Sequence, residues 1–143
     1  MIVVGADTPE GMEIAAGLAE PDREVRVFVT DPARGAELRS LGLKVALGDV
    51  SDEGHVGAAA TRCFSAVLIT AAATDGREIS FAEDGDQVLE GWARAVTEAE
   101  VSRVIWVTDQ TPPPVGVTEV AIVDPGSPDL AERVLALDDA RKI

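Results

Sequence analysis

A glycine-punctuated segment near the start of the chain has residue types and spacing suited to binding a phosphate group. An apolar run at 1–4 leads into Gly5, and Gly11 opens an Ala-rich segment with helical spacing. Strand, glycine turn and helix in this order are typical of a dinucleotide-binding βαβ unit. Thr8 can cap the helix, and Pro9 suits its first position. The helix N-terminus would then direct free N–H groups at a pyrophosphate.

The glycine pattern of this turn is incomplete. Thr8 stands where a middle glycine would let a diphosphate approach the backbone, and Glu10 places a carboxylate in the first helical turn. An acid there stabilises a helix start but would compete with a bound phosphate. The turn is therefore open to two interpretations, a dinucleotide site or the ordinary first strand–helix connection of an α/β protein.

Other reactive side chains are few. With one cysteine, Cys63, and one histidine, His55, the chain lacks the ligands of a zinc site. We expect Cys63 to be buried as a small apolar residue and His55 to face solvent. An acidic cluster could hold Mg²⁺ or exchange protons, but a solvated loop is the favoured interpretation. Its members are Asp75, Glu78, Glu83, Asp84 and Asp86. The sequence predicts no catalytic constellation and no metal site.

The composition limits the partners of the chain. A formal net charge of −14 over 143 residues disfavours nucleic acids and anionic membrane surfaces, both of which attract clustered cations. No apolar run reaches the length of a membrane-spanning helix, and the strand at 1–4 leaves no room for a signal peptide. A single cysteine suits a reducing compartment. These observations predict one cytoplasmic domain spanning 1–143.

The elements that would position the glycine turn alternate between strand and helix patterns. Strands are expected at 1–4, 24–30, 44–48, 64–71, 103–108 and 118–123, with helices at 9–19, 32–41, 52–62 (capped by Ser51), 84–99 and 128–141 (capped by Ser127). The segments 72–83 and 109–114 show no regular pattern. This alternation predicts an α/β fold, a doubly wound parallel sheet of order 3-2-1-4-5-6. A ligand is expected over the carboxyl ends of the first and fourth strands.

Five strand-associated segments resemble the NmrA-like branch of the atypical short-chain dehydrogenases/reductases. They are Ile2–Ala6, Glu24–Val29, Leu47–Val50, Ala66–Ile69 and Val101–Thr108, and a Pro-Gly segment at 122–126 adds to them. The match extends over about residues 1–125, and it rests on the order and spacing of the segments. It implies a Rossmann-like domain that binds NAD or NADP.

The resemblance implies a set of cofactor-binding positions. The pyrophosphate would lie against Gly5, Ala6, Thr8 and Gly11, the adenine against Asp49 and Val50, and the nicotinamide-side ribose against Thr70, Ala71 and Ala72. From the residues alone, Asp49 could equally be a turn former, and the small residues at 70–72 could equally serve packing.

The end of the second strand departs from the family pattern. Thr30 stands where NmrA-like members carry an arginine for the 2′-phosphate of NADP, and Asp31 lies one position beyond the ribose-binding acid of members that prefer NAD. Arg34 could reach a 2′-phosphate from the following helix, or be a solvated helix residue. The choice between NAD and NADP stays open.

Residues 1–143 lack the catalytic pair of the active family members. The resemblance implies a tyrosine assisted by a lysine four positions on, yet the chain contains no tyrosine. Thr108 and Asp109 replace the expected serine region. The favoured hypothesis is a non-catalytic sensor or regulatory subunit. Its alternatives are an oxidoreductase that needs a partner chain and an interaction module with a decayed nucleotide site. A homo-oligomer or a protein partner is expected, because little covers the strands at 103–108 and 118–123.

Overall fold

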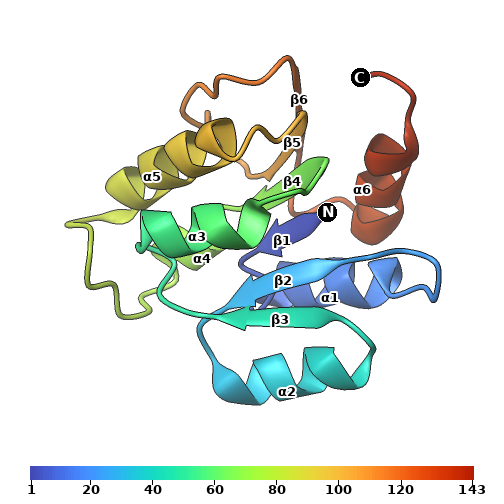
Figure 1. Cartoon of the computed structure of the whole chain (residues 1–143), viewed down its shortest axis with the longest axis horizontal. Coiled ribbons are helices and arrows are strands. Elements are labelled where there is room, and N and C mark those ends of the chain that lie inside the picture. The colour runs from blue at the N-terminus through green and yellow to red at the C-terminus, as the bar shows by residue number, and fades with distance from the viewer.

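A six-stranded parallel sheet of order β3-β2-β1-β4-β5-β6 forms the centre of the computed structural model, which describes all 143 residues (Figure 1). The strands are β1 (Ile2–Val4), β2 (Arg26–Val29), β3 (Lys44–Leu47), β4 (Ser65–Ile69), β5 (Arg103–Val107) and β6 (Glu119–Val123). Every neighbouring pair is parallel. The predicted α/β fold class and strand order are confirmed.

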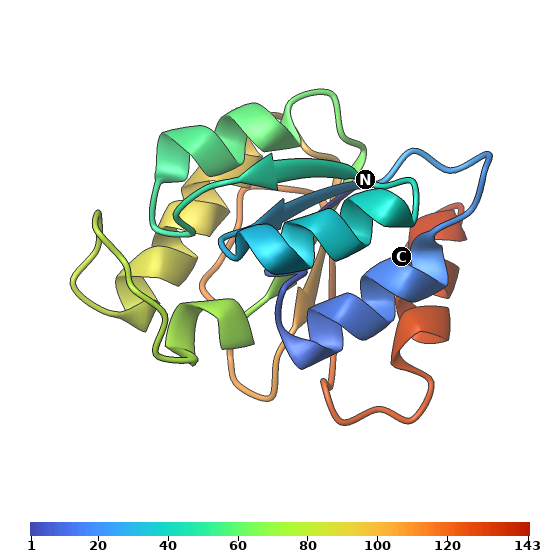
Figure 2. The same ribbon diagram turned by 90° about the horizontal axis from the view of Figure 1, so that it is seen from below.

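Helices cover both faces of this sheet (Figure 2). They are α1 (Pro9–Leu18), α2 (Pro32–Ser40), α3 (Glu53–Ala60), α4 (Ala71–Thr74), α5 (Gly85–Glu98) and α6 (Leu130–Asp139). Side chains of α1, α2 and α6 share one core with one face of the sheet, and those of α3, α4 and α5 share a second core with the other face. The winding therefore reverses between β1 and β4, which is where ligands bind in open α/β sheets.

The alternation of side chains along β1 explains how one short strand serves both cores. Ile2 and Val4 point into the core under α3 and α5, whereas Val3 points into the core under α1 and α6. All three are fully buried. A strand buried on both faces needs an uninterrupted apolar sequence, and this is what the first four residues supply.

Two glycines let the chain turn sharply from β1 into α1. Gly5 has φ +87°, a conformation that side chains with a Cβ rarely adopt. A Cβ on Gly11 would lie 2.2 Å from the Gly5 carbonyl oxygen, so only glycine allows the helix to approach the turn this closely. The two positions predicted to shape the turn thus do so.

The structure corrects two helix starts. Asp52, not Ser51, caps α3, with its carboxylate accepting from the His55 N–H. The last helix begins at Leu130 after Asp129, so the expectation that Ser127 caps it is wrong. The sequence pattern also missed α4, a single turn of small residues within a segment that showed no periodicity.

The β6 edge of the sheet is lightly covered, as expected. Val120 and Ile122 are 44% and 57% exposed, although their β5 neighbours in the register, Val104 and Trp106, are fully buried. The β5–β6 connection is an irregular proline-rich loop, so no helix packs over these two side chains. No helix of the chain combines the length and apolar character that crossing a membrane requires.

Candidate functional site

The β1–α1 turn is held together by Thr8. The Thr8 hydroxyl donates to the Gly5 carbonyl oxygen at 2.7 Å and accepts from the Gly11 N–H at 3.0 Å. This is the predicted N-cap, with Pro9 in the first helical position. Because the hydroxyl is buried and fully engaged, it shapes the turn from inside. The backbone N–H groups of Ala6 and Asp7 donate no hydrogen bond within the chain. Ala6 is fully buried, so of the two only Asp7 is partly open to solvent.

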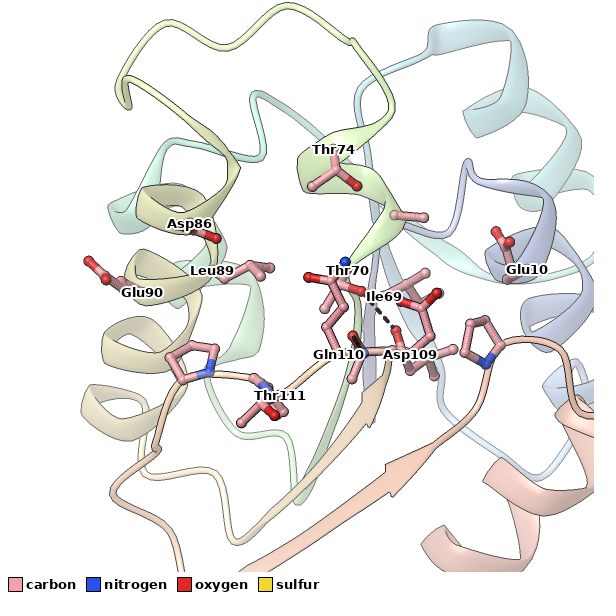
Figure 3. A pocket seen from close by; sticks show the side chains of 16 residues that line it. Glu10, Ile69, Thr70, Thr74, Asp86, Leu89, Glu90, Asp109, Gln110 and Thr111 are labelled. Carbon is pink, nitrogen blue, oxygen red and sulfur yellow. Dashed lines mark hydrogen bonds between the residues drawn. The ribbon is translucent and has the colours of Figure 1, made fainter.

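A cavity of about 570 Å³ lies at the carboxyl ends of β4 and β5 (Figure 3). Its floor comes from Thr70 and from the loop after β5, and in the close-up Glu10 lies on the opposite side from the α5 residues Asp86 and Glu90. Further lining residues are Ile69, Ala71, Thr74, Leu89, Val107, Thr108, Asp109, Gln110, Thr111, Pro112, Pro113 and Pro125. We call this space the β4–β5 cavity.

The β4–β5 cavity is acidic. Four carboxylates line it, from Glu10, Asp86, Glu90 and Asp109, and no lysine, arginine or histidine does. One oxygen of Glu10, Oε2, is buried without a hydrogen-bond partner. A buried carboxylate oxygen without a donor is costly, so Glu10 favours a ligand that brings a donor or a positive charge. Thr108, in the expected serine region, accepts from the Gln110 N–H through its hydroxyl oxygen at 3.2 Å.

A second hollow, of about 370 Å³, lies beside the ends of β1 and β2. Its lining residues are Asp7, Thr30, Asp31, Asp75, Gly76 and Arg77. Thr74 lines the β4–β5 cavity and the next residue, Asp75, lines this one, so both spaces reach the end of α4. We call the second space the β2 hollow.

Asp7 and Arg77 form an ion pair that borders the β2 hollow. Nη1 of Arg77 lies 2.9 Å from Asp7 Oδ1, and both side chains are largely buried. Asp7 also accepts from the backbone N–H groups of Thr30 (2.8 Å) and Asp31 (3.1 Å) at the end of β2. The other side of the guanidinium pairs with Asp75. The turn, the end of β2 and the segment after α4 therefore meet at one carboxylate.

The segment after α4 continues over the end of β3, and we call residues 75–83 the strap. The Ser80 N–H donates to Asp49 at 2.9 Å, and the Phe81 N–H donates to the Ser51 hydroxyl at 3.0 Å. Ser51 in turn donates its backbone N–H and its hydroxyl to Asp49. Asp49 therefore accepts three hydrogen bonds, two from its own loop and one from the strap. Val50 is buried, and its carbonyl accepts from the Trp92 indole at 2.8 Å.

The ionisation of Asp49, Asp75 and Arg77 reflects these contacts. Burial works to raise the pKa of Asp49, but the hydrogen bonds from Ser51 and Ser80 outweigh it and lower the pKa below its ordinary value. Hydrogen bonds from Arg77 lower the pKa of Asp75. Burial works to lower the pKa of Arg77, and the two carboxylates outweigh it and raise the pKa. All three groups are charged at neutral pH, which keeps the strap in place.

The structure brings most of the predicted positions to one edge of the sheet. Gly5, Ala6, Thr8 and Gly11 form the turn, Thr30 and Asp31 border the β2 hollow, Thr70 and Ala71 line the β4–β5 cavity, and Asp49 and Val50 lie under the strap. Unlike Thr70 and Ala71, Ala72 does not line the β4–β5 cavity: it is fully buried, and its Cβ lies 2.7 Å from the position that a Cβ on Gly5 would take. It packs against the turn.

The isolated reactive residues have structural surroundings. Cys63 is buried, as predicted. The expectation of a solvent-facing His55 is wrong, because its ring is partly buried and packs edge-on against Phe28 at a centroid distance of 5.0 Å. The acidic residues from 75 to 86 form no group of side chains that could hold a metal ion.

Sequence reasoning missed the two residues that connect the turn to the strap. Asp7 could have been noticed as an acid at the third position of the glycine turn. Arg77 lies in a segment without periodicity, so nothing in its local sequence signals a partner 70 residues away.

The fold, the reversal of winding between β1 and β4, and the glycine turn define a Rossmann-like dinucleotide-binding domain. A family model described as NAD(P)H-binding matches residues 5–117, and the chain belongs to this family. A comparison with curated protein sequences gives no match.

Solved structures similar to this chain include two reductases and a quinone oxidoreductase. A triphenylmethane reductase from Citrobacter sp. aligns at TM-score 0.61 and 16% identity over 96% of this chain and 42% of its own. The NADPH-dependent quinone oxidoreductase of Escherichia coli, complexed with NADPH, aligns at TM-score 0.61 and 21% identity over 76% of this chain and 36% of its own. ChuY, an anaerobilin reductase from Escherichia coli O157:H7, aligns at TM-score 0.57 and 21% identity over 75% of this chain and 49% of its own. The chain thus spans less than half the length of each, and the likeness shows the fold.

The residues present fit a nicotinamide dinucleotide at three places. The turn offers the free N–H group of Asp7, the Asp7 side chain lines the β2 hollow, and Glu10 in the first turn of α1 lines the β4–β5 cavity. Two features oppose such a ligand. Glu10 would face the phosphates, and the strap holds the Asp49 carboxylate. A ligand that used the Asp49 oxygen bonded to Ser80 would compete with that hydrogen bond.

Proposed function

We propose that residues 1–143 form a single NAD(P)-binding domain that acts by binding the dinucleotide, as a sensor or regulatory subunit. The observation that carries this proposal is the pair of spaces at the carboxyl edge of the sheet, one lined by Asp7 of the glycine turn and the other by Glu10 of the helix that follows it. In this arrangement the nicotinamide half takes the β4–β5 cavity near Thr70 and Ala71, and the adenosine half takes the β2 hollow and the end of β3.

The chemistry of the β4–β5 cavity supports binding without hydride transfer by this chain alone. Proton transfer in such reductions needs a donor whose pKa is matched to the task. The cavity is lined by carboxylates, threonines, glutamine and prolines, and the chain contains no tyrosine. Thr108 takes the place of the family's serine, with its hydroxyl oxygen accepting from the Gln110 N–H.

The strap supplies a physical basis for sensing. Ser80 and Phe81 donate to Asp49 and Ser51, the groups that the family resemblance assigns to the adenine side. An adenine that needs Asp49 competes with the strap tip for one acceptor. Binding is then coupled to release of residues 79–83, and a ligand shifts an equilibrium only through such a difference in affinity for two states.

A sensor needs a partner, and the exposed β6 edge is an apolar surface that one could cover. Val120 and Ile122 lie on the strand that follows the proline-rich loop, part of which lines the β4–β5 cavity. We propose that a second copy or another protein covers them. Mass measurement in solution, with Ile122→Ser as the variant, tests this: a dimer that dissociates in the variant supports it, and a monomer at all concentrations contradicts association of two copies.

Thermal unfolding with and without millimolar NAD⁺, NADH, NADP⁺ and NADPH tests binding. A ligand that binds only the folded state stabilises it by about 2.7 kcal/mol at a hundredfold excess over its Kd. A raised midpoint with at least one dinucleotide supports the proposal, and no shift with any of the four supports an interaction module instead. Oxidation of the reduced cofactor by quinone or dye acceptors, without a second protein, would contradict the non-catalytic role. Turnover only with a partner chain would favour the oxidoreductase alternative.

A further inference from the structure

The Asp7 carboxylate occupies an anion position at the end of β2. Three donors converge on it: the backbone N–H groups of Thr30 and Asp31, at 2.8 and 3.1 Å, and Nη1 of Arg77, at 2.9 Å. In Rossmann-like folds the end of the second strand is where the adenosine ribose lies, and the 2′-phosphate of NADP needs a cation there. In this chain the donors that could meet such a phosphate already hold a carboxylate.

The charges around the β2 hollow oppose a second anion. Asp7, Asp31 and Asp75 contribute three carboxylates to its lining, and Arg77 is the one cation. Nη1 of Arg77 faces Asp7, and its Nε and Nη2 face Asp75. A phosphate with a charge of about −1.5 to −2 would have to displace both carboxylates to reach the guanidinium. An unphosphorylated ribose meets no such conflict, since its hydroxyls can donate to carboxylates.

We propose that Asp7, held by Arg77, is a specificity-determining residue that makes this domain prefer NAD(H) over NADP(H). The inference rests on the proposed function and adds the identity of the cofactor. Asp7 comes from the glycine turn, whereas the acid that ordinarily reads the ribose comes from the end of the second strand. The nearby arginine that would ordinarily favour NADP is neutralised here by two carboxylates.

Calorimetric titration of the intact chain with NAD⁺ and NADP⁺ at low salt tests this inference. We expect the Kd for NAD⁺ to be at least tenfold lower than for NADP⁺. In the Asp7→Asn variant the ratio of the Kd for NADP⁺ to the Kd for NAD⁺ should fall at least fivefold, chiefly through tighter NADP⁺ binding. Asp22→Asn removes the same charge at an exposed position outside both spaces and should leave the ratio unchanged. Higher ionic strength should also narrow the ratio, because salt screens the repulsion.

Equal affinities, or a preference for NADP⁺, would overturn the inference and leave the proposed function intact. An unchanged ratio in Asp7→Asn would also overturn it. Failure of both dinucleotides to bind the unmodified chain overturns the proposed function and this inference together. Should Asp7→Asn fail to fold, Asp75→Asn removes a carboxylate from the other side of Arg77 without touching the Thr30 and Asp31 N–H groups. It should narrow the ratio in the same direction, and no change would count against the inference.

Discussion

The Ser80 backbone N–H donates to the Asp49 carboxylate at 2.9 Å and so connects the strap to the end of β3. Asp49 also receives two hydrogen bonds from Ser51, which itself accepts from Phe81. The carboxylate assigned to the adenine by family resemblance therefore already has partners within the chain. If a dinucleotide binds as proposed, these hydrogen bonds exchange with those of the ligand.

Loss of the Ser51 hydroxyl should loosen the strap tip. The Ser51→Ala substitution removes the acceptor of the Phe81 N–H and a donor to Asp49. A smaller population of the strap-bound state raises the apparent affinity for a ligand that competes with it. We expect dinucleotide binding several-fold tighter than in the unmodified chain, measured by calorimetry. Ser40→Ala removes an exposed hydroxyl on α2 and serves as control. Weaker binding in Ser51→Ala would contradict the competition.

Acid should release the strap. The folded-state pKa values of Asp49 and Asp75 are lowered, so their contribution to stability is complete above the ordinary value of 3.8 and is lost as the pH falls through the folded-state pKa. The Asp49→Asn substitution should lower the free energy of unfolding by about 1–2 kcal/mol at pH 7. It should also reduce the loss of stability between pH 5 and pH 3, measured by urea unfolding. If the free energy of unfolding falls equally in the two proteins between pH 5 and pH 3, the ionisation of Asp49 is not coupled to folding.

Arg103 fastens α6 to the sheet. It is fully buried, pairs with Glu119 at 2.9 Å, and donates to the carbonyl oxygens of Leu137, Asp138 and Ala140 at the end of α6. Removing one partner of a buried ion pair costs about 3–5 kcal/mol. We expect Arg103→Met to lower the free energy of unfolding, measured in urea, by about 3 kcal/mol. Arg141→Met, at an exposed position, should change stability little. A loss below about 1 kcal/mol in Arg103→Met would refute the role assigned to this cluster.

Neutralising Glu10 should strengthen dinucleotide binding. Its carboxylate lies in the first turn of α1, where the positive end of the helix dipole would otherwise attract a phosphate, and its Oε2 is buried without a partner. Glu10→Gln should lower the Kd several-fold, with a larger effect at low salt. Glu13→Gln, on the exposed side of the same helix, controls for net charge. An equal effect of both substitutions would show that Glu10 has no special position.

The fold was predictable because its signals are local and repeated. Short apolar runs such as 1–4 and 65–69 are buried on both faces, and the cap residues Thr8, Asp31 and Asp84 lie where the sequence suggests helix starts. Alternation of strands and helices then leaves few topologies. Element boundaries were less certain: serine and aspartate lie close together at 51–52, and either type can cap a helix.

The site was only partly predictable, because its decisive contacts are long-range. The glycine turn is readable since its residues are neighbours in sequence. Asp7 and Asp49 each have one partner in the strap, Arg77 and Ser80, which no periodic pattern marks. These contacts form because the chain after α4 passes back over the ends of β2 and β3. A carboxylate at a ligand-binding position was foreseeable, but its hydrogen bonds to the strap were not.

Hydrogen exchange at the strap tip tests the central claim most directly. The Ser80 and Phe81 N–H groups donate to Asp49 and Ser51 in the structure described, so they should exchange slowly relative to a free loop. With NAD⁺ or NADH present at concentrations that raise the unfolding midpoint, exchange at 79–83 should become faster while the core strands stay protected. Slower or unchanged exchange at 79–83 in the bound protein would contradict the proposed exchange between strap and dinucleotide.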